Sequence, residues 1–449
     1  MHVTTSRARL LPSFFVFLSL ILVACGGTTA SSGQQSGAGK TLHVLIGYNT
    51  TFAAVQRQWM QQVGNEFHKA TGATVAWDTY NGTNEEQTKL QTAVVSGSGP
   101  DIFSLGTTFV PTAQATKGFA PLTAQDWNLV GGKDRFFKQQ LTMSGSSPSQ
   151  QIAVPWVMRP FAMAYNKTLF QKAGITEPPK TWTDFVQDAQ KMTNAGSGVY
   201  GAEIDPSDTF DPWKIWWTFA NQLGSNFLSQ DLKTAQMNTP QAVSAVQFWF
   251  DWVTKYKIAD PAAMSWKAGD AVRAFDNGKV GMLIMITPTL NPTLKKSAVD
   301  GQYAYAPMPT IPYGMQARPA NGVAASTIVS GDMLAVADYS NVKDLAFSFI
   351  NLLTDNQHQL QWTQTFGDLP ANAAAASSLA SKDPQTAAFI QAEQGATPTP
   401  FSGEWGPLEV ALAGVSSKLA NEVATNHYDP SHIKPLLDQA NQQIQGQLH

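Results

Sequence analysis

The residue types that perform acid–base, nucleophilic or metal chemistry are present in this chain, but no catalytic pattern joins them. The sequence has neither a G-x-S-x-G turn nor an H-E-x-x-H helix, and its seven histidines are scattered. His427 and His432 are close in a segment that contains proline, where we expect no metal site. Two carboxylates at a suitable separation could form a glycosidase dyad, but nothing singles out a pair. The sequence therefore predicts no catalytic site, no metal and no cofactor.

A different chemistry, the non-covalent binding of a sugar, fits the side chains better. The chain has 13 Trp, and aromatic rings offer flat apolar faces to the C–H side of a pyranose. Amide, hydroxyl and carboxylate groups can pair with the sugar hydroxyls. Most of the Trp are expected to be core residues. The exceptions that we predict are Trp213 and one of Trp216 and Trp217, in an aromatic stretch at 208–224.

Strand and helix patterns alternate through the part of the chain that must position such side chains. Strand-like runs at residues 42–46, 74–77 and 100–105 are separated by helical patterns at 53–70 and 85–95. This alternation predicts a parallel sheet with helices on both faces, in which ligands bind at the carboxyl ends of the strands. The residues expected around that crevice are Tyr48, Asn49, Gly106, Thr107, Thr108 and Trp156.

The first 24 residues have the pattern of a secretion signal. Arg7 and Arg9 precede an apolar stretch at 10–23 that is too short to span a bilayer comfortably. The stretch ends in Leu-Val-Ala before Cys25, which resembles a bacterial lipobox. We expect cleavage before Cys25 and attachment of lipid to its sulfur; the alternative is an ordinary signal whose free thiol is simply removed. Residues 25–40 are rich in Gly, Ser and Gln and predict a flexible tether.

Length and charge narrow the class of protein further. At 449 residues the chain should hold more than one core. Its net charge is −3 and only 14% of its residues are charged, so nucleic acid is not an expected partner. Cys25 is the only cysteine, which excludes an internal disulfide.

One stretch, from Gln151 to Asp184, connects the first α/β unit to a second. It reads as strand, crossing, strand, helix, loop and helix, with a strand break at Pro155 and helix caps at Asn166 and Thr181. Its motifs are A-V-P-W at 153–156, Y-N-K-T-L-F-Q-K-A-G-I at 165–175 and P-P-K-T-W-T-D-F at 178–185. Further motifs follow in F-D-N-G-K-V-G-M at 275–282, Y-A-P-M-P at 305–309 and G-D-L-P-A at 367–371.

These motifs, in this order, resemble those of the extracellular solute-binding proteins of ABC sugar importers, the maltodextrin-binding-protein-like family. The resemblance covers roughly residues 41–449. It implies an α/β, two-lobe periplasmic-binding-protein-like fold of type II, each lobe a mostly parallel sheet flanked by helices, with about three crossing segments. The N-terminal lobe would comprise residues 41–157 and 330–370, and the C-terminal lobe residues 158–329 and 371–449.

The resemblance also implies a function. The protein would be a monomer that is anchored by lipid to the extracytoplasmic face of the cell membrane, or in the periplasm where there is an outer membrane. It would capture a sugar or oligosaccharide and deliver it to the transmembrane subunits of an ABC permease, without catalysis or cofactor. The alternatives that the residues leave open are a secreted lipoprotein glycosidase and a binding protein for a non-sugar solute.

The ligand contacts implied by the resemblance are carried over position by position. They are Tyr48, Asn49, Glu85 or Gln87, Thr107, Thr108, Trp156, Arg159, Trp213, Trp217, Thr287 and Trp405. Arg159 departs from the family, in which many members have Asp or Glu near this position. Because a guanidinium binds carboxylates in bidentate fashion, we hypothesise an acidic sugar such as a uronate. The alternative is that Arg159 binds neutral hydroxyls or an internal Asp. Asp101 and Trp182 also match the family, and we expect structural roles for both.

Overall fold

The structure is a computed structural model that describes residues 37–49, 52–209 and 211–448. The expected signal peptide, the lipid site at Cys25 and residues 25–36 of the expected tether lie outside the described residues. No helix within the described ranges is both long enough and apolar enough to cross a bilayer.

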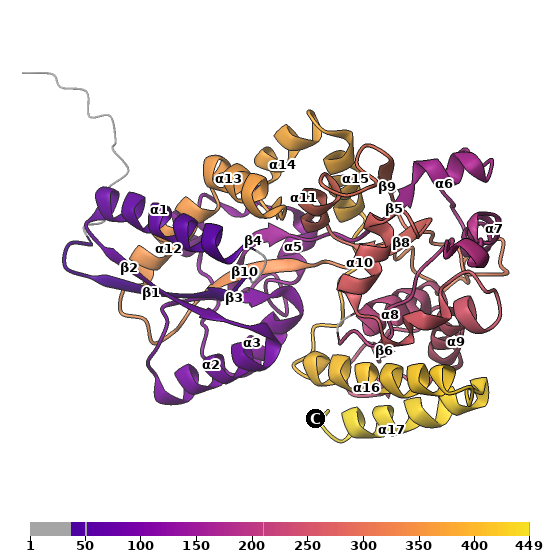
Figure 1. Ribbon diagram of the computed structural model, residues 1–449. Coiled ribbons are helices and arrows are strands. Elements are labelled where there is room, and N and C mark those ends of the chain that lie inside the picture. The colour runs from indigo at the N-terminus through magenta and orange to yellow at the C-terminus, as the bar shows by residue number, and fades with distance from the viewer. Residues whose placement is uncertain (1–36, 50–51, 210, 449) are drawn as a thin grey trace, which may run out of the picture. The chain divides into compact units, whose positions relative to one another are not determined.

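The first sheet has six strands that come from widely separated parts of the chain (Figure 1). In spatial order they are β11 (Leu369–Pro370), β4 (Ala153–Met158), β10 (Gly331–Val336), β3 (Ile102–Gly106), β1 (Thr41–Gly47) and β2 (Thr74–Tyr80). Strand β1 pairs in parallel with β2 and β3, as the alternation of strands and helices predicts. Strand β10 is antiparallel to both β3 and β4, so its amino end lies at the same edge of the sheet as their carboxyl ends.

Helices cover this sheet with apolar faces of helical period. In α1 (Ala53–Thr71) the buried side chains include Trp59, Val63 and Phe67, and the helix ends at Gly72, whose φ of 80° favours glycine. The other helices between β2 and β4 and between β10 and β11 are α2 (Gly82–Ser96), η1 (Thr107–Phe109), α3 (Val110–Ala115), α4 (Ala124–Leu129), η2 (Lys133–Arg135), α5 (Lys138–Thr142), α12 (Lys343–Leu353) and α13 (Asn356–Phe366).

The second sheet has the order β8 (Met282–Ile286), β5 (Ala162–Asn166) and β9 (Tyr303–Ala306), and both outer strands are antiparallel to β5. The expectation of a mostly parallel sheet in this part of the chain is therefore wrong. The expectation came from the family resemblance, and the strand itself could not correct it, since all five residues of β8 are buried. A continuous apolar run is typical of parallel strands but carries no information on the direction of the partner strand.

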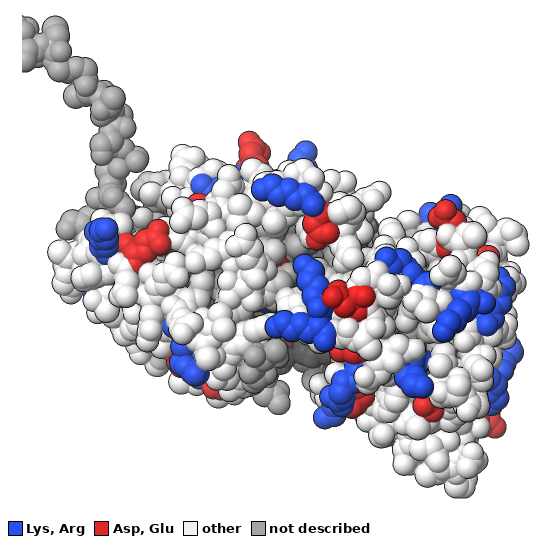
Figure 2. Space-filling model, turned by 45° about the horizontal axis from the view of Figure 1, so that its top comes forward, with Lys and Arg blue, Asp and Glu red and all other residues white. Residues whose placement is uncertain are grey.

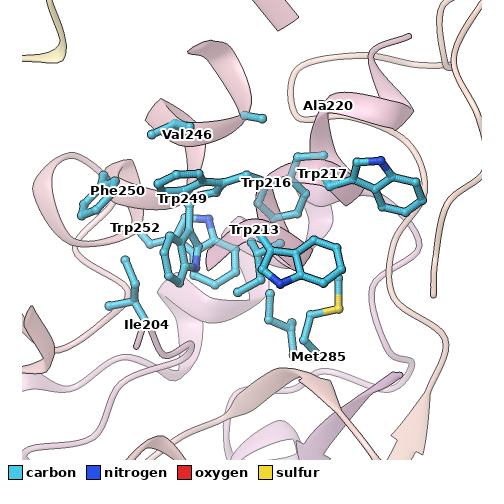
Figure 3. Packing of buried hydrophobic residues seen from close by; sticks show 14 of the residues in the cluster. Ile204, Trp213, Trp216, Trp217, Ala220, Val246, Trp249, Phe250, Trp252 and Met285 are labelled. Atoms are coloured by element: carbon cyan, nitrogen blue, oxygen red, sulfur yellow. The ribbon is translucent and has the colours of Figure 1, made fainter. Parts of the chain in front are cut away.

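Tryptophans dominate the core beside the second sheet (Figure 3). They lie on α7 (Trp182–Met192), α8 (Asp211–Gln222) and α9 (Pro240–Thr254), and α8 packs along α9. The remaining elements of this part are α6 (Lys167–Lys172), η3 (Ala195–Ser197), β6 (Phe227–Leu228), β7 (Ala235–Gln236), η4 (Pro261–Ser265), α10 (Ala268–Asp276), η5 (Pro288–Leu290), α11 (Asn291–Leu294), α14 (Ala373–Ala380), α15 (Pro384–Gln394), α16 (Trp405–Ala424), η6 (Pro430–His432) and α17 (Ile433–Gln445).

The stretch 151–184 has the predicted order of elements, from β4 through β5 and α6 to α7. The side chain of Asn166 caps α6 by accepting from two backbone N–H groups, and Thr181 caps α7 by accepting from Asp184 N. The predicted strand break at Pro155 is wrong, because β4 continues through it to Met158. The register with β10 shifts between Asp332 and Met333, where Pro155 faces Met333, and this irregularity accommodates a residue that has no N–H to donate.

Candidate binding site

A cavity of about 360 Å³ lies where β3 ends and β10 begins. Its lining includes Tyr80, Glu86, Gly106, Thr107, Thr108, Arg159, Phe161, Trp213, Lys214, Thr287, Asp332 and Glu409. A second cavity, of about 340 Å³, shares Tyr80, Arg159 and Asp332 with the first. It continues past Tyr48, Asn49, Trp156 and Asp368. The two cavities therefore form one extended site on either side of Arg159.

Arg159 is held by two carboxylates at the centre of this site. Its Nη1 and Nη2 donate to the two oxygens of Asp332, each at 2.8 Å, and its Nε donates to Asp368 Oδ1 at 2.7 Å. A fourth bond joins Nη2 to Asp368 Oδ2 at 3.2 Å. Although burial opposes the charge, these carboxylates raise the pKa of Arg159. Two carboxylates of the protein therefore balance the charge of the guanidinium. This removes the basis of the acidic-sugar hypothesis and fits the alternative that Arg159 binds an internal Asp.

Two further carboxyl groups of the cavity are almost completely buried. Glu86 on α2 is 7% exposed and Glu409 on α16 is 6% exposed. Burial raises the pKa of Glu86 to about 8, with a further contribution from the negative charge of Asp332. Burial also raises the pKa of Glu409 to about 8, against the opposing effects of Thr108 and Lys214. At neutral pH both groups are mostly protonated, so each offers an O–H donor as well as an acceptor.

Apolar surface complements these groups. Trp213 and Phe161 both line the first cavity, and the Nζ of Lys214 lies 4.8 Å from the centre of the Phe161 ring. Tyr80 lines the same cavity, and its hydroxyl donates to Ser104 O at 3.1 Å. The cavity therefore combines aromatic rings with hydrogen-bonding groups. Such a combination suits a ligand that has both apolar faces and polar groups.

Comparison with known proteins identifies the family. Residues 51–360 match the family described as "Bacterial extracellular solute-binding protein". The chain belongs to this family. The resemblance seen in its motifs is therefore confirmed, and the chain is a solute-binding protein rather than an enzyme, which excludes the glycosidase alternative.

The alignments with two relatives cover most of this solute-binding protein. It is 26% identical over 403 residues to the diacetylchitobiose binding protein DasA of Streptomyces coelicolor, covering 86% of this chain and 87% of the relative. It is 24% identical over 413 residues to a maltooligosaccharide ABC transporter solute-binding lipoprotein of Streptococcus pneumoniae, covering 88% of each.

Solved structures show the same fold. Maltose-bound MalE3 of T. maritima has a TM-score of 0.72 at 18% identity, over 91% of this chain and all of that one. The sugar-binding protein MalE of Xanthomonas citri has a TM-score of 0.73 at 20% identity, over 91% of this chain and 98% of that one. The two-sheet α/β architecture is thus that of type II periplasmic binding proteins.

Several predicted contacts of this solute-binding protein line the site. Thr107, Thr108, Trp213 and Thr287 border the first cavity, and Tyr48, Asn49 and Trp156 border the second. Asn49 also has a local role, because its Oδ1 accepts from Phe52 N at 3.0 Å and so holds the turn before α1. Trp156 is 2% exposed and packs against Trp59 and Trp362.

Two predicted tryptophans lie in the core behind the cavity. Trp217 is fully buried, and its indole N–H donates to Asn226 Oδ1 at 2.7 Å. Trp405 is also fully buried and meets the ring of Trp213 edge to face, with ring centres 5.6 Å apart. Trp405 therefore supports the position of Trp213, and Trp217 packs against Trp405 with ring centres 6.4 Å apart.

The residue of α2 that lines the cavity is Glu86, which lies between the predicted contacts Glu85 and Gln87. Glu85 accepts from Asn81 N at 2.7 Å and lies 3.4 Å from Lys89, so it stabilises the start of the helix, and Gln87 is half-buried. Glu86 faces the cavity instead. The signal was its spacing of four residues from the buried Leu90.

The other lining groups that the sequence analysis missed are Tyr80, Lys214, Asp332, Asp368 and Glu409. Among the residues that the structure describes, no group of three or more His, Cys, Asp or Glu side chains is arranged to hold a metal ion.

Proposed function

We propose that this protein captures a sugar or oligosaccharide in the extended site around Arg159 and delivers it to an ABC permease. The observation that carries the proposal is the combination of aromatic faces and partly neutral carboxyl groups around two adjoining cavities. The names of the relatives, which refer to diacetylchitobiose and maltooligosaccharides, support the class of ligand. The length of the site favours more than one sugar ring.

Each group has a role in such binding. Trp213 supplies apolar surface for the C–H face of a ring, Asp332 accepts from hydroxyls, and Glu86 and Glu409 both accept and donate. Residues 41–157 with 330–370, and 158–329 with 371–449, act as the two lobes that close on the ligand. Closure removes water from the site and creates the shape that the permease recognises.

A negatively charged solute, such as a phosphodiester, fits the site less well than a sugar. Four N–H bonds of Arg159 already go to Asp332 and Asp368. The other charged groups that line the first cavity are Glu86, Lys214 and Glu409, so carboxyl groups outnumber cations. On the face seen in Figure 2 most of the surface is white, and blue groups gather over its right-hand part with red groups among them.

A melting experiment against a panel of sugars tests the proposal. A ligand at about 100 times its Kd should stabilise the protein by about 2.7 kcal/mol. For a chain of this length, that corresponds to a rise in Tm of about 3 °C. The panel should contain mono- and oligosaccharides, with polyamines and phosphodiesters as controls. A rise in Tm with a control class and with no sugar would overturn the carbohydrate assignment.

The proposed anchor is lipid on the sulfur of Cys25, which keeps a monomeric protein at the extracytoplasmic face of the membrane. Replacing Cys25 with Ser should move most of the protein out of the membrane fraction, because the modified sulfur is lost. Fractionation and immunoblotting measure this, and the mass of the amino-terminal peptide identifies the lipid. Equal membrane retention of both proteins, with an unmodified Cys25 in the wild type, would contradict the anchor.

A further inference from the structure

The binding site contains more carboxyl groups than cations. Glu86, Asp332 and Glu409 line the first cavity, and Asp368 shares Arg159 with Asp332. The cations of the set are Arg159 and Lys214. If every group were ionised, these four carboxylates and two cations would leave two negative charges in excess. The site therefore has capacity for a positive charge that its own side chains do not supply.

Glu86 and Glu409 are only partly satisfied by their neighbours, which are Tyr80 and Gly106 for Glu86 and Thr108 and Trp405 for Glu409. Glu409 Oε1 is buried and has no hydrogen-bond partner among the residues that the structure describes. Glu86 Oε1 accepts from Gly106 N at the long distance of 3.4 Å. The two groups are near enough for the charge of Glu409 to raise the pKa of Glu86, though less than burial and Asp332 do. Buried polar groups normally find full partners, so these two are suited to a ligand that donates.

We propose that the ligand is a sugar with a free amino group, whose ammonium binds between Glu86 and Glu409. This inference rests on the proposed function and names the ligand class of that site. An ammonium offers three donors and no acceptor, which complements two carboxylates, and its charge takes the place of the protons that these two groups hold in the free protein. A uronate would meet carboxylates and an Arg159 that is already paired.

Proton release accompanies this binding. In the free protein, both carboxyl groups are mostly protonated at neutral pH. An adjacent ammonium favours their ionised forms, so protons leave as the ligand binds. A neutral sugar leaves the carboxyl groups protonated and releases none.

The surrounding charges determine where the ammonium lies. Glu86 is faced by Tyr80 from β2, Asp332 from β10 and Glu409 from α16. Glu409 is faced by Lys214 from α8 and by the side chains of Thr108 and Trp405. Because Lys214 lies on the Glu409 side and Asp332 on the Glu86 side, the ammonium is directed toward Glu86.

The test compares sugars that differ only in the group on C2. For β-1,4-linked disaccharides, these are the glucosamine disaccharide, diacetylchitobiose and cellobiose; glucosamine, N-acetylglucosamine and glucose form a second series. Calorimetric titration at pH 6 and 7, in two buffers of different ionisation enthalpy, gives the Kd and the number of protons released. We expect the amine to bind about tenfold more tightly than its counterparts. Its Kd should fall by up to about tenfold from pH 6 to pH 7 if one proton is released.

Variants separate the role of Glu86 from a general effect of buried acids. Glu86→Gln should reduce the ratio of the Kd of the neutral sugar to the Kd of the amine to about one. It should also remove the pH dependence of the Kd of the amine. Glu393→Gln is the matched control, because Glu393 is fully buried with a pKa of about 8 but bonds to Gln140 outside the cavity. It should leave this ratio unchanged.

The outcomes distinguish this inference from the proposed function. If neutral or N-acetylated sugars bind as tightly as the amines, with no proton release, the inference is wrong and sugar binding stands. If no sugar of the wider panel binds, the proposed function fails and the inference with it. Should Glu86→Gln fail to fold, the C2 series on the wild-type protein still decides.

Discussion

Arg159→Ala is expected to lower the free energy of unfolding by about 3–5 kcal/mol, because it leaves two paired carboxylates without their cation. Asp368 has a side chain that is 4% exposed and Asp332 one that is 18% exposed, so water can replace little of what Arg159 supplies. Trp362 Nε1 still donates to Asp368 Oδ2 at 2.9 Å in the variant, but one neutral donor does not balance the charge. Urea denaturation followed by Trp fluorescence measures the loss.

A charge-neutral variant is the control for this prediction. Combining Arg159→Met with Asp332→Asn and Asp368→Asn removes the cation together with both charges, and it should recover most of the lost stability. A loss of less than about 1 kcal/mol at neutral pH would mean that the triad behaves like an exposed ion pair.

The local features of this fold could be predicted from the sequence. The alternation of strands and helices predicts the parallel pairing of β1 with β2 and β3. Side chains that cap a helix act within three residues, so Asn166 and Thr181 could be recognised as caps from short motifs.

Long-range pairing could not be predicted in the same way. The partners of Arg159 lie 173 and 209 residues farther along the chain, and nothing near Arg159 indicates them. The direction of β8 relative to β5 was likewise hidden, because a strand that is buried throughout reads the same in either orientation. These are features that tertiary contacts decide.

The sequence could predict only in part which tryptophans of α8 line the cavity and which lie in the core. Residues 212–222 are all buried, so burial does not show which side of the helix meets the ligand. A polar stripe of Lys214, Thr218, Asn221 and Gln222 runs along it, and Lys214 lines the cavity. Trp213 and Trp217 are four residues apart and therefore lie on similar faces. Only the structure separates them, since Trp213 lines the cavity and Trp217 bonds to Asn226.

That separation predicts different effects on ligand affinity for two similar substitutions. Trp213→Ala and Trp217→Ala should each lower the free energy of unfolding by about 3–5 kcal/mol, because each removes a fully buried indole. Trp213→Ala should also weaken binding of the sugar identified in the melting panel by about thirtyfold, as expected for an aromatic anchor. Trp217→Ala, which removes no lining surface, should change the Kd by less than about threefold.

Calorimetric titration well below the Tm of both variants measures the affinity for the ligand separately from the stability of the protein. Because the two variants should lose the same stability, each is the control of the other. Equal losses of affinity would mean that both tryptophans act through the packing of α8, so that Trp213 would be no more a ligand contact than Trp217. A large loss confined to Trp217→Ala would place the ligand beside Trp217, farther along α8. The expected asymmetry instead ties binding to Trp213, which lines the same cavity as Lys214 and Glu86.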